Sequence, residues 1–229
     1  MPYFPDLTPY RYFGGERRPL VNVGWLARGH DFPTGPIDER FVDGLVRCAL
    51  HPVRLAMGLH RCDLCADGPR DIEAYGRRVP LGNGEIRAAW NGVEYAAPTL
   101  VVHYVSEHGY APPDGFLRAV LARAGRITPL TTEEVAALRA LDHSAQIARA
   151  RALIEPFAAC SPYEWPKHAL QQLPDEGWVE QVPEEVADDD ALGVLLDDLA
   201  WLHENEASRT ALLAGIVEKA RELSAREKP

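Results

Sequence analysis

Two cysteines and a histidine lie close enough in the sequence to bind one metal ion. They are His60, Cys62 and Cys65, in the pattern His-x-Cys-x-x-Cys. Zinc prefers nitrogen and sulfur ligands in a tetrahedral arrangement, and a Cys-x-x-Cys turn lets two sulfur atoms converge on one ion. The histidine reaches the same ion if the chain bends ahead of Cys62. We therefore predict that these three residues bind a structural zinc ion.

Two other interpretations of this motif stay open. The cysteines could be free thiols in an ordinary loop, or they could be a redox pair. A redox Cys-x-x-Cys normally opens a helix that follows a strand, and the sequence around Cys62 does not predict that context. The chain has four cysteines in 229 residues, which is not the pattern of a disulfide-rich secreted domain.

A structural zinc site needs a fourth protein ligand. The sequence offers several candidates and does not choose among them: Cys48, His30, His51 and His103. His108 falls in the middle of the apolar face of a predicted helix, and we interpret it as a core histidine. If no fourth ligand completes the site, the ion would bind and polarise a water molecule. Glu85 would then be the candidate base of a zinc-dependent hydrolase.

The motif lies in a predicted loop between a helix and a β-hairpin. Asp38 can cap a helix whose apolar residues recur at helical spacing until Pro52 stops it. The hairpin spans residues 84–97 around Asn91-Gly92, a pair that accepts the positive φ angles of a type I′ turn. We expect residues 77–81 to pair alongside the hairpin as a third strand.

Two helices are expected to follow the hairpin. Pro98 suits the first turn of a helix that runs to about His108, with Gly109 just past its end. A second helix fits residues 114–124. After a boundary near residue 128, Thr131 and Glu134 form a capping box, and further helices are predicted at 145–158, 192–203 and 209–225. The predicted fold is therefore α+β in two parts: a small antiparallel sheet with packed helices in residues 1–128, followed by an all-α acidic region in residues 129–229.

Charge separates the two parts. Residues 1–128 contain 14 Asp and Glu against 15 basic residues, all of them arginine, for a net charge of +1. Residues 129–229 contain 20 acidic and 9 basic residues, for a net charge of −11. Such an acidic half argues against nucleic-acid binding, which depends on a basic surface. It suits a basic protein partner, or it serves only solubility.

The sequence contains no predicted targeting or membrane-spanning segment. Its first residues lack a basic region followed by an apolar run. No apolar stretch approaches the roughly 18 residues that a bilayer span needs. We therefore expect a cytoplasmic protein.

Several short motifs mark the first part of the chain. They are Asn22-Val23-Gly24-Trp25-Leu26, Gly29-His30-Asp31-Phe32-Pro33-Thr34-Gly35, His60-x-Cys62-x-x-Cys65, Leu81-Gly82-Asn83-Gly84-Glu85-Ile86-Arg87, and Tyr95-Ala96-Ala97-Pro98-Thr99-Leu100 leading into His103-Tyr104-Val105. With these motifs, residues 1–125 resemble a family of uncharacterised bacterial proteins from high-GC organisms. The resemblance implies no activity.

These features predict a non-catalytic intracellular bacterial interaction or accessory protein, for instance of the immunity type, stabilised by structural zinc. The alternative is a zinc-dependent hydrolase with an open coordination position. Four protein ligands around the ion would favour the first hypothesis, and three ligands with a water molecule would favour the second.

Overall fold

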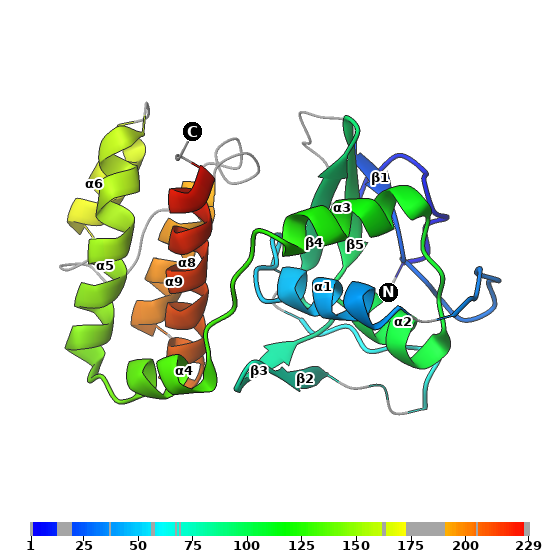
Figure 1. Ribbon diagram of the computed structural model, residues 1–229, viewed down its shortest axis with the longest axis horizontal. Helices are drawn as coiled ribbons and strands as arrows, with labels where there is room; N and C mark the ends of the chain where they lie inside the picture. Colours follow the sequence, from blue (N-terminus) through cyan, green and yellow to red (C-terminus); the bar gives the residue numbers. More distant parts are fainter. Residues whose placement is uncertain are drawn as a thin grey trace. The chain divides into compact units, whose positions relative to one another are not determined.

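The computed structural model describes residues 2–12, 20–36, 38–55, 58–66, 68, 70–161, 164–172, 191–204 and 206–226. The chain divides into two compact units. Unit 1 comprises Met1–Ala74 and Arg78–Ile127, and unit 2 comprises Tyr75–Arg77 and Thr128–Pro229. Small sheets and packed helices make up the described elements (Figure 1), which confirms the predicted α+β class.

The main sheet of unit 1 contains the predicted hairpin. Strands β4 (Glu85–Trp90) and β5 (Val93–Pro98) are antiparallel, and β1 (Leu20–Asn22) pairs with β5 in parallel. The turn residues Asn91 and Gly92 have φ angles of 49° and 78°, as a type I′ turn requires. The predicted hairpin and its type I′ turn at Asn91-Gly92 are therefore confirmed.

The third-strand prediction for residues 77–81 is wrong. Strand β3 (Arg77–Pro80) pairs with β2 (Asp71–Ala74) in a separate two-stranded sheet. Tyr75 and Gly76 both have positive φ, 53° and 69°, so the chain reverses at once and β3 meets the strand just before it. The edge of β5 that lies away from β4 is taken by β1.

Three helices complete unit 1 in its described residues. Helix α1 (Glu39–Ala49) begins as predicted, because the Asp38 side chain accepts a hydrogen bond from the backbone N–H of Arg40. Helices α2 (Val101–His108) and α3 (Asp114–Ala124) follow the hairpin, although Pro98 is the last residue of β5 and not part of α2. Helix α3 packs against α1 and against β4 (Figure 1).

The core of unit 1 draws on the sheet, the three helices and the cysteine loop. Its buried side chains include Val23, Leu45, Ile86, Leu100, Tyr104 and Phe116. Cys62 belongs to the same cluster and is 3% exposed. The loop that carries Cys62 and Cys65 therefore forms part of the boundary of the core.

Unit 2 is a helical bundle in its described residues. It contains α4 (Thr132–Arg139), α5 (His143–Cys160), α6 (Trp165–Gln172), α8 (Ala191–Glu204) and α9 (Arg209–Arg226). Helices α5, α8 and α9 pack on one another (Figure 1). They enclose a separate apolar core that includes Ile154, Leu195, Leu199, Leu213 and Ile216.

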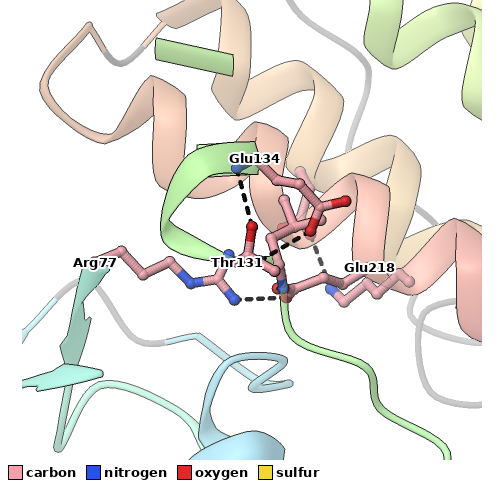
Figure 2. Close-up of polar contacts among 7 residues, drawn as sticks. Arg77, Thr131, Glu134 and Glu218 are labelled. Atoms are coloured by element: carbon pink, nitrogen blue, oxygen red, sulfur yellow. Dashed lines mark hydrogen bonds and ion pairs between the residues drawn. The ribbon is translucent and has the colours of Figure 1, made fainter. Parts of the chain in front are cut away.

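Two polar arrangements mark the start of unit 2 (Figure 2). The predicted capping box is present: the Thr131 hydroxyl accepts from the N–H of Glu134, and the Glu134 carboxylate accepts from the N–H of Thr131. Close by, Glu218 accepts a 2.5 Å hydrogen bond from the Arg77 guanidinium and a 2.6 Å bond from the N–H of Leu130. Both side chains of the ion pair are buried, so this pair has little screening by water.

Candidate metal centre

Four potential metal ligands of unit 1 converge on one point. Cys62 and Cys65 come from the loop ahead of β2, and His103 and His108 come from α2. Their four ligand atoms all lie within 4.8 Å of one another. This is a Cys₂His₂ set, one of the combinations typical of structural zinc.

The distances between the donor atoms suit a tetrahedral ion. The Sγ of Cys65 lies 3.3 Å from Nε2 of His103 and 3.2 Å from Nε2 of His108, and the Sγ of Cys62 lies 3.3 Å from Nε2 of His108. The two Nε2 atoms are 3.2 Å apart. A zinc tetrahedron with bonds of about 2.3 Å to sulfur and about 2.05 Å to nitrogen has edges of about 3.5 Å (S to N) and about 3.3 Å (N to N). The observed edges fall slightly inside these lengths.

Hydrogen bonds alone do not account for this packing. The Nε2 atom of His108 has three close polar neighbours, on Cys62, Cys65 and His103. A neutral imidazole carries a single proton, so Nε2 can donate toward one of them at most. A cation at the centre of the group would instead satisfy all four donor atoms together.

Local backbone features hold the cysteine loop in place. The backbone N–H of His60 donates to the carbonyl of Gly82 at 2.9 Å. Gly82 has a φ of 86°, and a Cβ there would overlap the carbonyl oxygen of His60. Between the cysteines, Asp63 accepts from the backbone N–H of Arg28, and its carbonyl accepts from Nε of Arg28 at 2.8 Å. The loop is thus held at the start of the motif and between its two cysteines.

Burial shifts the pKa of two donors, His103 toward the state that a metal ligand needs and Cys62 away from it. Burial raises the pKa of the Cys62 thiol, while hydrogen bonds from the backbone N–H groups of Cys65 and Leu64 act in the opposite direction. Burial also lowers the pKa of His103, with the charge of His108 adding to the effect. His103 is therefore held neutral, as a ligand must be, whereas Cys62 must lose its proton to a metal.

The structure brings together two of the three residues predicted from the motif. Cys62 and Cys65 belong to the group, and His60 does not. The Nε2 of His60 instead lies 3.5 Å from the hydroxyl of Tyr12, in the N-terminal arm. His60 contributes through its backbone bond to Gly82, which positions the loop.

Of the four candidates for the remaining ligand, only His103 lies in the group. His30 stacks on Tyr3, with ring centroids 3.7 Å apart. Cys48 and His51 are buried elsewhere, and the Sγ of Cys48 lies 4.0 Å from the carbonyl of Val120.

His108, expected in the core from its position on the helix, lies instead in the donor group and is half-buried. A spacing of five residues sets two side chains about 140° apart on an ideal helix. Helical periodicity therefore did not single out His103 and His108 as a pair. A usable signal was the presence of two histidines within one short helix, in the same predicted unit as a Cys-x-x-Cys.

Glu85, the candidate base of the hydrolase hypothesis, is hydrogen-bonded to other side chains. Its carboxylate accepts a 2.6 Å hydrogen bond from the hydroxyl of Tyr10 and a 2.8 Å bond from Nε of Arg87. The guanidinium of Arg87 also lies 4.6 Å from the centre of the Tyr10 ring. These contacts fasten the N-terminal arm to β4, so Glu85 has a structural role here.

A family model matches residues 2–121. The chain belongs to that family, a domain of unknown function (DUF7919). The DUF7919 match contains all four donor residues and agrees with the expected resemblance to an uncharacterised family. Searches of curated proteins and of solved structures found no match to the chain.

The helices of the DUF7919 protein were also compared with the length and apolar character of a membrane span. Among the described residues, no helix is both long enough and apolar enough to cross a membrane.

Proposed function

We propose that Cys62, Cys65, His103 and His108 bind one zinc ion in a structural site, and that this protein is a non-catalytic interaction protein. The observation that carries the zinc assignment is the convergence of two sulfur and two nitrogen donors within 4.8 Å. The ion joins the cysteine loop to α2 across the edge of the unit 1 core. In small domains such an ion supplies folding free energy directly.

The donor count favours a structural ion over a hydrolytic one. A catalytic zinc keeps one position for water, with three protein ligands. Four protein donors complete a tetrahedron, and Glu85, the candidate base, is held by Tyr10 and Arg87. The hydrolase hypothesis therefore has no specific observation in its favour.

Metal content tests the zinc site. We expect native mass spectrometry and elemental analysis to find one zinc per chain in protein purified without chelators. Cys65→Ser and His108→Asn should lose most of it, because each removes a donor. Cys160→Ser and His30→Asn are matched controls outside the group and should keep it.

The variant His60→Asn distinguishes the ligand set predicted from the sequence motif from the ligand set seen in the structure. The ring of His60 lies outside the donor group, so this variant should keep zinc at one per chain. Loss of zinc in His60→Asn with retention in His108→Asn would overturn the assigned ligand set.

The interaction role rests on charge and on the absence of an open metal position in the proposed site. Residues 129–229 carry a net charge of −11, which suits a basic protein partner. Co-purification should yield a defined complex whose stability falls as salt rises. A chain that forms no defined complex, or that hydrolyses a substrate in a zinc-dependent manner, would contradict this role.

A further inference from the structure

The four donors of the candidate metal centre are unequally exposed. Cys62 and His103 are each 3% exposed, whereas Cys65 and His108 are half-buried. One edge of the group, formed by Cys65 and His108, is therefore within reach of small solutes, and the opposite edge is sealed in the core.

Building on the proposed zinc site, we propose that Cys62 and Cys65 are a redox-sensitive pair that releases the ion when a hydroperoxide oxidises them. Cys65 reacts first, Cys62 closes a disulfide, and zinc leaves. This assignment unites the zinc and the redox interpretations of the Cys-x-x-Cys motif, because the same two sulfurs serve both states.

The geometry favours Cys65 as the site of first attack. Thiolate character and exposure govern oxidation by peroxides, and zinc keeps a coordinated sulfur deprotonated. Of the two cysteines, Cys65 is the more exposed residue. Its sulfur also lies within 3.3 Å of Nε2 on both His103 and His108, so its oxidation disturbs the centre of the group.

The second sulfur is close enough to complete the reaction. The Sγ atoms of Cys62 and Cys65 lie within 4.8 Å of each other, in a turn with two intervening residues. A sulfenic acid on Cys65 would therefore meet a resolving thiolate on Cys62 before it meets further peroxide.

The chemical balance is that of a two-electron oxidation. The Cys65 thiolate attacks the hydroperoxide; the O–O bond breaks, an S–O bond forms, and after uptake of one proton the products are the sulfenic acid and an alcohol or water. The Cys62 thiolate then attacks the Cys65 sulfur. The S–S bond forms as the S–O bond breaks, and hydroxide leaves as water after taking up a second proton.

Disulfide formation removes both sulfur ligands at once. His103 and His108 remain, and two imidazoles bind zinc far more weakly than a complete set of four ligands. The cysteine loop would then lose the metal tie to α2, while its backbone and Asp63 contacts remain. The inferred outcome is a local loosening of unit 1 that a thiol reductant and zinc reverse.

Zinc release on oxidation tests the proposal. Zinc-loaded full-length protein is treated with hydrogen peroxide in the presence of a colorimetric zinc chelator, and the peptides are mapped by mass spectrometry without reduction. We expect loss of about one zinc per chain, together with a peptide that carries an internal 62–65 disulfide. A reductant and added zinc should restore the original content.

Two variants make the outcome specific. Cys160→Ser removes an exposed thiol outside the site and should release zinc as the wild type does. Cys65→His keeps four zinc donors but cannot form the disulfide, so it should hold its ion at a peroxide concentration that strips the wild type. If Cys65→His does not bind zinc, the peptide map of the oxidised wild type tests the proposal by itself. A 62–65 disulfide supports it, and the absence of that disulfide contradicts it.

The two proposals fail in different ways. Protein that never contains zinc overturns the proposed structural site. Protein that contains zinc and keeps it after peroxide treatment, or that releases zinc with Cys65 as a sulfinic acid and no disulfide, overturns the redox pair alone.

Discussion

The chemistry of the candidate metal centre depends on the protonation of single side chains. Burial raises the pKa of Cys62 and lowers that of His103. Zinc binds the thiolate and the neutral imidazole, so the proton that competes with the metal is the one on the thiol. At low pH the imidazoles compete as well.

We predict that zinc affinity falls as pH falls. The raised pKa keeps the metal-free Cys62 thiol protonated to higher pH than an ordinary cysteine, and zinc must displace that proton. Below this pKa, each displaced proton weakens binding about tenfold per pH unit. Competition with a chelator at several pH values, with calorimetry in buffers of different ionisation enthalpy, would measure proton release. Affinity that is independent of pH would contradict thiolate ligation.

The backbone conformation of Gly82 is a second feature of a single residue on which stability depends. Gly82→Ala should destabilise the protein strongly, because Gly82 has a φ of 86° and the added Cβ would overlap the His60 carbonyl. Gly92→Ala is the matched control, with a φ of 78° and nothing within 4 Å of the added Cβ. It should lower the free energy of unfolding by only about 1–2 kcal/mol. Urea unfolding of both variants would measure the difference. An equal loss of unfolding free energy in the two variants would contradict the proposed role of the His60–Gly82 contact.

At the scale of elements, the order of strands depends on two tight turns. Asn91-Gly92 joins β4 to β5, and Tyr75-Gly76 joins β2 to β3. Each turn pairs the strands that flank it, so each hairpin forms from local sequence. The place of β1 beside β5 has no such local cause and depends on the packing of distant segments.

Helix α9 carries Glu218, which forms a buried ion pair with Arg77. We predict that Glu218→Gln lowers the free energy of unfolding by about 3–5 kcal/mol, because it leaves the Arg77 guanidinium buried beside a neutral partner. Glu164→Gln removes an exposed ion pair with Lys167 and should change stability by less than about 1 kcal/mol. Thermal and chemical unfolding would measure the stability change in each of the two variants. Equal effects would show that burial of the Arg77–Glu218 pair has no energetic consequence.

At the scale of the whole molecule, each unit has its own apolar core. The unit 1 core includes Cys62, and the unit 2 core draws on α4, α5, α6, α8 and α9. The proposed zinc ion therefore belongs to one core only.

We predict that zinc removal loosens unit 1 selectively. After treatment with a chelator, amide hydrogen exchange should speed up in residues 58–66 and in α2, since the ion no longer joins them. Exchange in α8 and α9 should stay unchanged. The Cys65→Ser variant should give the same pattern without a chelator, and faster exchange throughout both units would show instead that they unfold together.

The sequence by itself determined the features that depend on neighbouring residues. The Asn-Gly turn, the Asp38 cap, the Thr131–Glu134 capping box and the bounds of α3 follow from local backbone chemistry, and they appear as predicted. The Cys-x-x-Cys pair is equally local, because a short turn is enough to bring two sulfurs together. The family resemblance also depended on sequence alone.

Only the tertiary structure decided the remaining ligands and the strand order. His108 lies more than 40 residues after the cysteines, and its spacing from His103 does not follow the helical period, so only the packing of α2 against the cysteine loop brings it into the group. His60 lies next to the cysteines in sequence, but its backbone is bound to Gly82 and its ring lies near Tyr12. Proximity in sequence could not predict these contacts, because they depend on where the core places segments that are far apart in the chain.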